Sequence, residues 1–131
     1  MLEFWGDWCG DGRATYPQLR SLVKCLEGKP FALVGINSDQ DIQKLKERMK
    51  EESITWPSWR NGGNTQGPIS TAWNVNGWPT IYVLDDEGVI RHKNVRGESM
   101  DKAVNTLLKE MGVNVKIDAR SVEIDAKSGP K

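Results

Sequence analysis

The chain has 131 residues, and 18 lysine and arginine residues balance 18 aspartate and glutamate residues, so its formal net charge is zero. This length favours one domain with its own hydrophobic core, and the charge balance argues against broad electrostatic binding to nucleic acid or anionic lipid. The sequence contains no run of about 18 apolar residues, so no membrane span is predicted. Its N-terminus has no basic segment followed by an apolar stretch, so no export signal is predicted. We therefore expect a soluble monomeric domain, although a mature domain without its signal would have the same composition.

The first apolar run, Leu2 to Trp5, is long enough for a buried strand. A helix is expected from Cys9 onward, and Pro17 inside it is expected to kink it. The apolar residues of this helix recur on one face, at Leu19, Leu22, Val23 and Leu26.

The two cysteines, Cys9 and Cys25, are not expected to form a disulfide. On one helix they would lie about 24 Å apart along the axis, whereas the Cα atoms of bridged cysteines lie within about 7 Å. Cys25 lies off the centre of the apolar face and is assigned no role. Both thiols are therefore expected to be free or to pair only with outside partners.

The segment 31–37, FALVGIN, is continuously apolar and predicts a central strand covered on both faces. Ser38 or Asp39 can cap a second helix, whose inner side carries Ile42, Leu45 and Met49. This alternation of strand and helix predicts a parallel βαβ unit with a right-handed crossover. A short extended piece and a Gly/Asn-rich loop follow over 54–67, and then a brief helix over 68–75.

A β-hairpin is predicted from Ile81–Leu84 and Val89–Ile90, which are joined by a turn of Asp, Glu and Gly residues. The last helix carries an apolar stripe made of Met100, Ala103, Val104, Leu107, Leu108 and Met111. The predicted fold class is therefore α/β: a central mixed sheet flanked by helices, with a βαβ unit followed by a hairpin and a C-terminal helix. These elements form one predicted domain, residues 1–112.

Residues 113–131 are predicted to be a C-terminal extension. Apolar and polar residues alternate over 113–119 and again over 122–126, which is typical of two half-buried strands. Such strands would cover part of the sheet or its exposed edge. A solvated tail is the alternative, and the final residues, KSGPK, are expected to be disordered.

Several short motifs resemble the thioredoxin superfamily, and most closely its TlpA/ResA-like branch of bacterial thiol–disulfide proteins. They are Phe4-Trp5, Trp8-Cys9-Gly10, Pro17, Trp78-Pro79-Thr80 and Gly88. The resemblance covers residues 1 to about 111 and implies a thioredoxin-like fold. It also implies disulfide exchange with protein or peptide thiols, no cofactor, and a periplasmic or membrane-facing location for a trimmed domain. Family members usually carry a hairpin before the first strand, and this chain starts at that strand.

The resemblance departs from the family at Gly12, where the second cysteine of the active site would lie. Cys9 itself precedes a helix, whose unpaired N–H groups and dipole stabilise a thiolate nucleophile. Asp11 places a carboxylate two residues from Cys9, which disfavours the thiolate, and Arg13 acts in the opposite direction. The net electrostatic effect at Cys9 is left open.

Pro79 matches the cis-proline of the family, which places the backbone of the preceding residue, here Trp78, beside the reactive thiol. Together with Trp8, Trp78 is expected to line an aromatic groove for an extended substrate, with Gly10 and Thr80 beside it. Ordinary core packing is the alternative for both tryptophans. Three tryptophans without a neighbouring motif are expected in the core, at Trp56, Trp59 and Trp73.

Glu3 interrupts a run that is expected to be buried, and burial of an unpaired carboxylate is costly. The resemblance implies that Glu3 is a proton acceptor beneath the site, with a pKa raised by desolvation. Two alternatives to this role are open. The family acid mainly serves the second cysteine, so with Gly12 in that place Glu3 is a relic without a function. Alternatively, Glu3 is exposed to solvent because the N-terminus frays. His92, the only histidine, is expected on the surface, and no metal site is predicted.

Three functions remain open. The first is a one-cysteine thiol–disulfide oxidoreductase that forms mixed disulfides through Cys9 and depends on an external thiol for release. The second is a redox-inactive module that binds peptides in the tryptophan groove. The third is a one-cysteine peroxidase, which ranks last because Leu2 and Gly6 occupy the positions of the proline and the hydroxyl residue that such a site uses.

Overall fold

The computed structural model describes residues 1–117. Its elements, in chain order, are β1 (Leu2–Trp5), α1 (Gly10–Arg13), α2 (Tyr16–Cys25), β2 (Val34–Asn37), α3 (Ile42–Glu51), β3 (Ser58–Arg60), α4 (Pro68–Ala72), β4 (Thr80–Leu84), β5 (Ile90–Lys93) and α5 (Glu98–Glu110). Among these residues, no helix is both long and apolar enough to cross a membrane.

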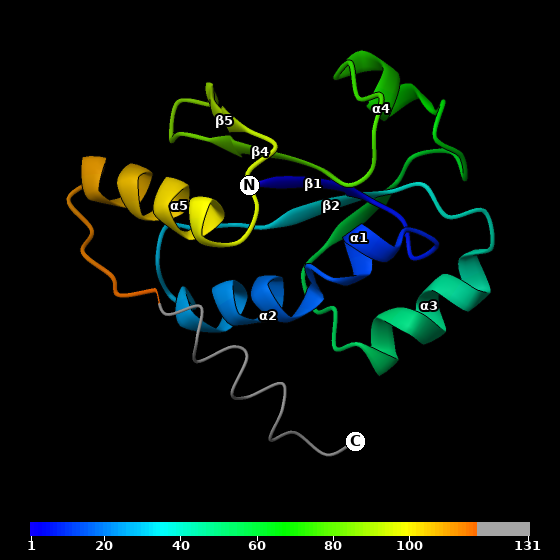
Figure 1. The fold of residues 1–131 in the computed structure, drawn as a ribbon, viewed down its shortest axis with the longest axis horizontal. Helices are drawn as coiled ribbons and strands as arrows, with labels where there is room; N and C mark the ends of the chain where they lie inside the picture. Colours follow the sequence, from blue (N-terminus) through cyan, green and yellow to red (C-terminus); the bar gives the residue numbers. More distant parts are fainter. Residues whose placement is uncertain (118–131) are drawn as a thin grey trace.

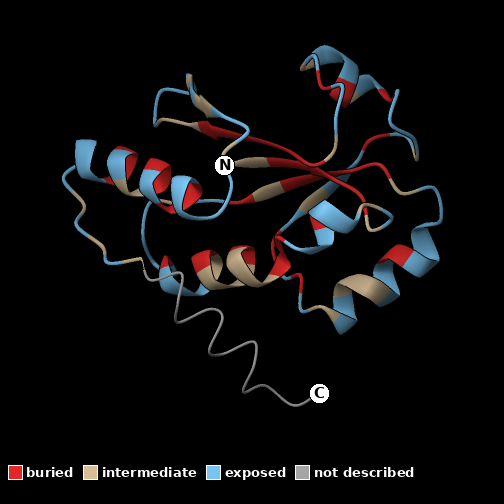
Figure 2. Ribbon diagram, viewed as in Figure 1, coloured by how far each residue is buried: buried red, intermediate tan, exposed pale blue. Residues whose placement is uncertain are grey.

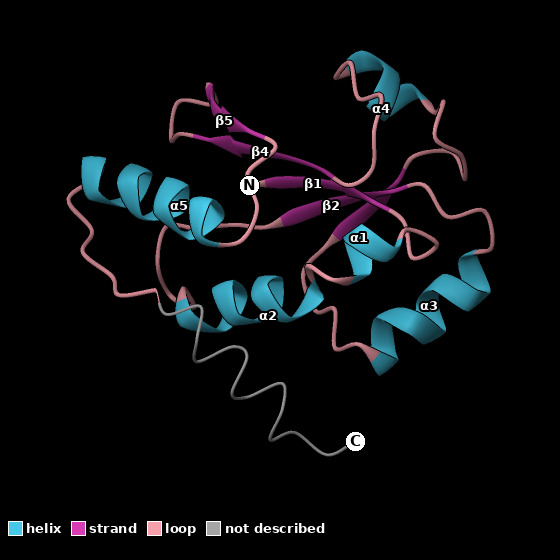
Figure 3. Ribbon diagram, viewed as in Figure 1, coloured by secondary structure: helices cyan, strands magenta, loops and turns pink. Residues whose placement is uncertain are grey.

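The strands form one five-stranded sheet in the order β3-β2-β1-β4-β5 (Figure 1). β1, β2 and β3 run parallel to one another, whereas β4 is antiparallel to β1 and β5 is antiparallel to β4. The predicted mixed sheet, its βαβ unit and its terminal hairpin are therefore confirmed. β1 lies at the centre of the sheet, so the loop that follows it leaves from the middle of the molecule (Figure 3).

Two hydrophobic clusters cover the two faces of the sheet, and the strands are buried between them (Figure 2). Because side chains alternate along a strand, adjacent residues of β1 enter different clusters. Trp5 packs with the inner faces of α2 and α5, and Phe4 packs with Tyr82 and the segment around α4. Helices thus flank both faces, as the apolar patterns predict.

The helix predicted from Cys9 onward is divided into two helices, because α1 ends at Arg13 and α2 begins at Tyr16. Pro17 lies in the first turn of α2 and not in a helix interior. A proline is well tolerated there because the first N–H groups of a helix have no partner within the helix. The expected kink is therefore a boundary between α1 and α2.

Two further predictions of local structure need correction. The cap of α3 is Asp41, not Ser38 or Asp39, because its Oδ1 accepts hydrogen bonds from the backbone N–H groups of Gln43 and Lys44 at 3.0 and 3.1 Å. The strand predicted over 31–37 is shorter and begins at Val34.

The tryptophans without a motif do not all lie in the core. Trp56 is buried, and Trp73 is half-buried and packs against Phe4 and Tyr82. Trp59 is 62% exposed, so its predicted core position is wrong. It lies on β3, which is the edge strand of the sheet within residues 1–117 and pairs there with β2.

Residues 113–117 form no strand, which corrects the prediction for the described part of the extension. The alternation in the sequence is nevertheless real, since Val113, Val115 and Ile117 are half-buried against the core cluster and the residues between them are exposed. The segment follows α5 and lies beside it, so the alternating contacts are with helices and not with a sheet edge. The predicted strand over 122–126 and the predicted disorder of KSGPK lie outside the described residues.

Candidate active site

Cys9 lies at the end of the loop after β1 and is the N-cap residue of α1, with extended backbone angles. Its side chain is half-buried, and its backbone N–H donates to the carbonyl oxygen of Gly6 at 3.1 Å. The Cys9 Sγ donates to the carbonyl oxygen of Trp78 at 3.3 Å. The Cys9 thiol and the loop before β4 are therefore in contact, although 69 residues separate them in the sequence.

The Trp78–Pro79 peptide bond is cis, as predicted, and it lies beside Cys9, as predicted. Two hydrogen bonds hold this loop from either side. Arg96 Nη2 donates to the carbonyl oxygen of Pro79 at 2.9 Å, and the hydroxyl of Thr80 donates to the carbonyl oxygen of Gly77 at 2.6 Å. No motif marks Arg96, which lies in the loop after β5.

Gly12 is buried in α1, one helical turn after Cys9. A Cβ atom on Gly12 would lie 3.5 Å from the Cβ of Cys9, 3.6 Å from the carbonyl oxygen of Gly6 and 3.9 Å from the Cys9 Sγ. All three are ordinary van der Waals distances, so the backbone here accommodates a side chain. The position that would carry a second thiol is present in the fold and lacks only the thiol.

Glu3 is fully buried in β1, between Gly35 on β2 and Ile81 on β4. The fraying considered from the sequence does not occur. Desolvation raises the pKa of this carboxyl to about 8, and the hydrogen bond with Thr15 opposes the rise. One oxygen, Oε1, has no partner among the described residues.

Thr15 connects Glu3 to the backbone of residue 12. The Thr15 Oγ1 lies 2.6 Å from the carbonyl oxygen of Gly12 and 3.2 Å from the Glu3 Oε2. A hydroxyl has one proton to donate. Thr15 therefore donates to one of these two acceptors at a time, and its donation to the Glu3 carboxylate opposes the rise of the Glu3 pKa. Glu3 thus lies beneath the residue 12 position, as expected, while its role in any reaction stays a prediction.

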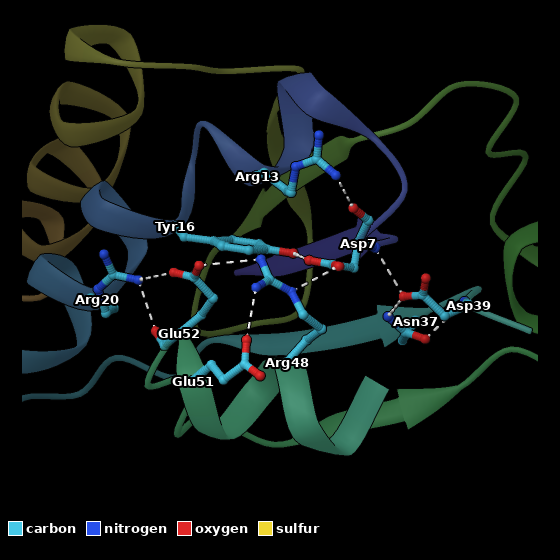
Figure 4. Close-up of polar contacts among 9 residues, drawn as sticks. All are labelled: Asp7, Arg13, Tyr16, Arg20, Asn37, Asp39, Arg48, Glu51 and Glu52. Atoms are coloured by element: carbon cyan, nitrogen blue, oxygen red, sulfur yellow. Dashed lines mark hydrogen bonds and ion pairs between the residues drawn. The ribbon is translucent and has the colours of Figure 1, made fainter. Parts of the chain in front are cut away.

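A polar network that sequence reasoning missed holds the loop between β1 and Cys9 (Figure 4). The Asp7 carboxylate accepts from the Tyr16 hydroxyl at 2.8 Å and from Arg48 Nε at 3.0 Å. The Asp7 backbone N–H donates to Asp39 Oδ2 at 2.9 Å, and its carbonyl oxygen accepts from Arg13 Nη1 at 2.9 Å. Asp7 thereby ties the loop to α2, to α3 and to the turn after β2. Its partner Arg48 lies 41 residues away, so no local pattern marks the pair.

The two tryptophans of the predicted groove border different hollows. Trp8 is 49% exposed, and its ring covers Gly6 so closely that a Cβ atom there would overlap it. Trp8 borders a hollow of about 160 Å³ together with Asp7 and residues of α3. Trp78 is half-buried on the second core cluster and borders a different hollow, of about 410 Å³, with Pro79 and Thr80. A single groove lined by both tryptophans remains a prediction.

The remaining candidate residues lie in the first turn of α1, at the end of α2 and on β5. Gly10 and Asp11 are exposed in the first turn of α1. Cys25 is exposed at the end of α2, and both cysteines are free. His92 is half-buried on β5. Within residues 1–117, no group of three or more histidine, cysteine, aspartate or glutamate side chains is placed to hold a metal ion.

Comparison with known proteins places this geometry in a family. A family model described as thioredoxin-like matches residues 1–90. The chain is 27% identical over 95 residues to the thiol:disulfide interchange protein DsbE of Pseudomonas aeruginosa, and 22% identical over 90 residues to the thiol-disulfide oxidoreductase ResA of Bacillus subtilis. These alignments cover 72% and 69% of this chain and 49% of each relative, so the chain spans about half the length of these curated relatives.

Solved structures agree with the fold. A thiol-disulfide oxidoreductase from Bacteroides fragilis superposes with a TM-score of 0.75 at 24% identity, covering 82% of this chain and 79% of that one. The thioredoxin domain of a thiol-disulfide oxidoreductase from Bacteroides vulgatus superposes with a TM-score of 0.73 at 23% identity, covering 80% and 75%. With the match over residues 1–90, these findings show that the chain belongs to the thioredoxin-like family and is a relative of the thiol–disulfide oxidoreductases DsbE and ResA.

Proposed function

We propose that this protein exchanges disulfides with protein or peptide thiols through Cys9 alone. One observation carries the proposal: the Cys9 sulfur lies 3.3 Å from the carbonyl oxygen of Trp78, at the start of α1, while residue 12 offers no second thiol. The backbone N–H groups at the start of a helix stabilise negative charge on such a sulfur. The arrangement therefore favours attack and lacks the means of intramolecular release.

The proposed reaction has two separate exchanges. The Cys9 thiolate attacks one sulfur of a substrate disulfide, a new Cys9 disulfide forms, and the old bond breaks with departure of the second substrate thiolate, which takes up a proton. A thiolate from another molecule then attacks the substrate sulfur of the adduct, the Cys9 bond breaks, and the Cys9 thiol is regenerated. Overall, one thiol enters and one thiol leaves while one disulfide is replaced by another, so the electrons balance without a cofactor.

Glu3 has no thiol to serve in this scheme. With a pKa of about 8 it is mostly protonated at neutral pH, and it lies beneath residue 12 through Thr15. We infer that Glu3 is retained as a buried acid whose partner position is filled by Gly12. A thiol introduced at residue 12 would give it a proton donor.

A peptide-binding module without redox chemistry is the second candidate. It is favoured by Trp8, which remains 49% exposed next to Cys9 and offers an aromatic surface to a partner. A peroxidase is disfavoured further, because the Trp8 ring fills the space beside Gly6 where that reaction would use a hydroxyl residue. We place the exchange in a periplasmic or membrane-facing compartment, where disulfides persist.

The direct test is to incubate the reduced protein with a small aromatic disulfide and to identify the modified residue by peptide mass. We expect one adduct at Cys9, absent in Cys9→Ser, and rapid release on addition of an external thiol. Cys25→Ser is the matched control and should leave the Cys9 adduct unchanged, although exposed Cys25 can react slowly by itself. Absence of a Cys9 adduct across the pH range of thiol ionisation would favour the binding module.

A further inference from the structure

The hollow beside Pro79 is lined by donors and basic groups. It has a volume of about 410 Å³ and lies between the loop before β4 and the loop after β5. Its charged lining residues are Lys93 and Arg96, and no aspartate or glutamate of the described residues lines it. The other polar side chains at its wall come from Asn74, Asn76, Asn94, Thr80 and Tyr82.

Both cations of this hollow lack an acidic partner within residues 1–117. Arg96 is oriented by its hydrogen bond to the carbonyl oxygen of Pro79, and Lys93 Nζ lies 5.8 Å from the centre of the Tyr82 ring. Neither takes part in an ion pair with a described residue, whereas other exposed arginines do, such as Arg91 with Glu110. The hollow thus presents two positive charges, and no carboxylate of the described residues pairs with either of them.

The hollow shares Trp78 with the surroundings of Cys9. Trp78, which lines it, places its carbonyl oxygen 3.3 Å from the Cys9 sulfur, and the next residue, Pro79, is held by Arg96. Any polypeptide whose sulfur bonds to Cys9 must pass close to Trp78. An extended chain advances about 3.3 Å for each residue, so side chains two or three residues from its cysteine lie about 7–10 Å farther on, within reach of the hollow.

The geometry points to a subsite for acidic side chains: the hollow lined by Lys93 and Arg96 binds a carboxylate of the substrate polypeptide, two or three residues from the cysteine that exchanges with Cys9. This inference rests on the proposed function and names its substrate class. The protein has a formal net charge of zero, so a preference for acidic peptides would come from this local charge and not from overall attraction.

Two matched peptides test the subsite. Each has one central cysteine, supplied as a mixed disulfide with a small aromatic thiol that leaves when Cys9 attacks the peptide sulfur. The peptides differ only in carrying glutamate or glutamine at the second and third residues on both sides of this cysteine. Binding is measured by fluorescence anisotropy with serine in place of the peptide cysteine, and exchange is measured as the rate of adduct formation at Cys9. We expect the glutamate peptide to bind and react about threefold to tenfold better at low salt, as for a pair of exposed ion pairs. The preference should shrink at 0.5 M salt, because the electrostatic screening length there is only about 4–5 Å.

Variants separate the hollow from general charge. Lys93→Glu with Arg96→Gln should abolish the preference, since glutamine at 96 can still donate to the Pro79 carbonyl. Lys46→Glu is the control, because Lys46 is exposed on α3 and makes no ion pair within residues 1–117. Lys46→Glu lowers the net charge by two units, against three for the double variant, and should keep the preference.

The outcomes distinguish the subsite from the exchange reaction. Equal binding of the two peptides, or a preference that survives Lys93→Glu with Arg96→Gln, overturns the subsite. Adducts that form equally fast with both peptides leave the exchange at Cys9 intact and also overturn the subsite. Selective binding of the glutamate peptide without any adduct supports the subsite and contradicts the proposed exchange.

Discussion

The Cβ of Cys9 lies 3.5 Å from the place where a Cβ on Gly12 would be, and that place is 3.9 Å from the Cys9 sulfur. Disulfides span Cβ–Cβ distances of about 3.5–4.5 Å. The backbone around α1 therefore keeps the spacing of a dithiol site, although residue 12 has no side chain.

We accordingly predict that Gly12→Cys forms a disulfide with Cys9 and gains catalytic turnover. An adjacent thiol expels a bound substrate at high effective concentration, so insulin reduction should rise by about tenfold or more. Ala14→Cys is the control, because residue 14 lies five positions from Cys9 and turns away on the helical wheel. A Gly12→Cys protein that keeps two free thiols at these positions under oxidant would show that the spacing does not support a disulfide.

The buried Glu3 carboxyl predicts a particular pH dependence of stability. Its pKa is about 8 in the folded protein and about 4.5 when unfolded. Between these values the folded state holds the extra proton, so the contribution of Glu3 is fully present below pH 4.5 and is lost as pH rises through 8.

The measurement is the free energy of unfolding of wild type and Glu3→Gln at several pH values. Wild type should lose stability relative to Glu3→Gln by up to about 1.4 kcal/mol for each pH unit in this range. Other groups, such as the terminal amine, titrate in both proteins and cancel in the difference. A difference that does not vary between pH 5 and pH 8 would show that Glu3 is not a buried acid.

Asp7 and Arg48 predict a coupled loss of stability in the loop that carries Cys9. The Arg48 Nε lies 3.0 Å from Asp7 Oδ2, and the Asp7 side chain is only 15% exposed. Arg48→Met leaves this carboxylate without its cation, and we expect a loss of about 1–2 kcal/mol.

A double-mutant cycle measures the coupling. Asp7→Asn in the Arg48→Met background should cost less than Asp7→Asn alone. Glu51→Gln is the control, since Glu51 is a 60% exposed partner of the same arginine and should change stability by less than about 0.5 kcal/mol. Additive losses for Asp7 and Arg48 would mean that the pair does not act as a unit.

The contrast between two tryptophans tests the placement of β3. Trp56 is 4% exposed and Trp59 is 62% exposed, three residues later. Trp56→Ala should cost about 3–5 kcal/mol, as for other large residues removed from a core. Trp59→Ala should change the unfolding free energy by no more than about 0.5 kcal/mol. Equal losses, measured by urea unfolding, would place Trp59 in the core after all.

The sequence predicted those features that local patterns record. The apolar run of β1, the helical stripes of α2 and α5 and the hairpin turn depend on spacing within one segment. The cis Trp78–Pro79 bond and its contact with Cys9 came from resemblance, through motifs that are far apart in the chain but short and ordered. Glu3 was marked by a charge inside an apolar run.

The features that were missed or misplaced depend on tertiary context. The Asp7–Arg48 pair and the Arg96 contact join distant segments without any shared motif. Trp59 is apolar wherever it lies, and only its place on an edge strand leaves it exposed. The alternation after residue 112 correctly indicated half-burial, yet the partner is α5, so no strand forms over 113–117.

Cys9 is expected to form one mixed disulfide and to remain in it until an external thiol releases it. The most direct measurement counts the leaving thiol released from an aromatic disulfide by Cys25→Ser protein, in which Cys9 is the only thiol. We predict a release of one equivalent that then stops, and that resumes only when a second thiol is added. Continued release without an added thiol, or no release at any pH up to thiol ionisation, would contradict the account.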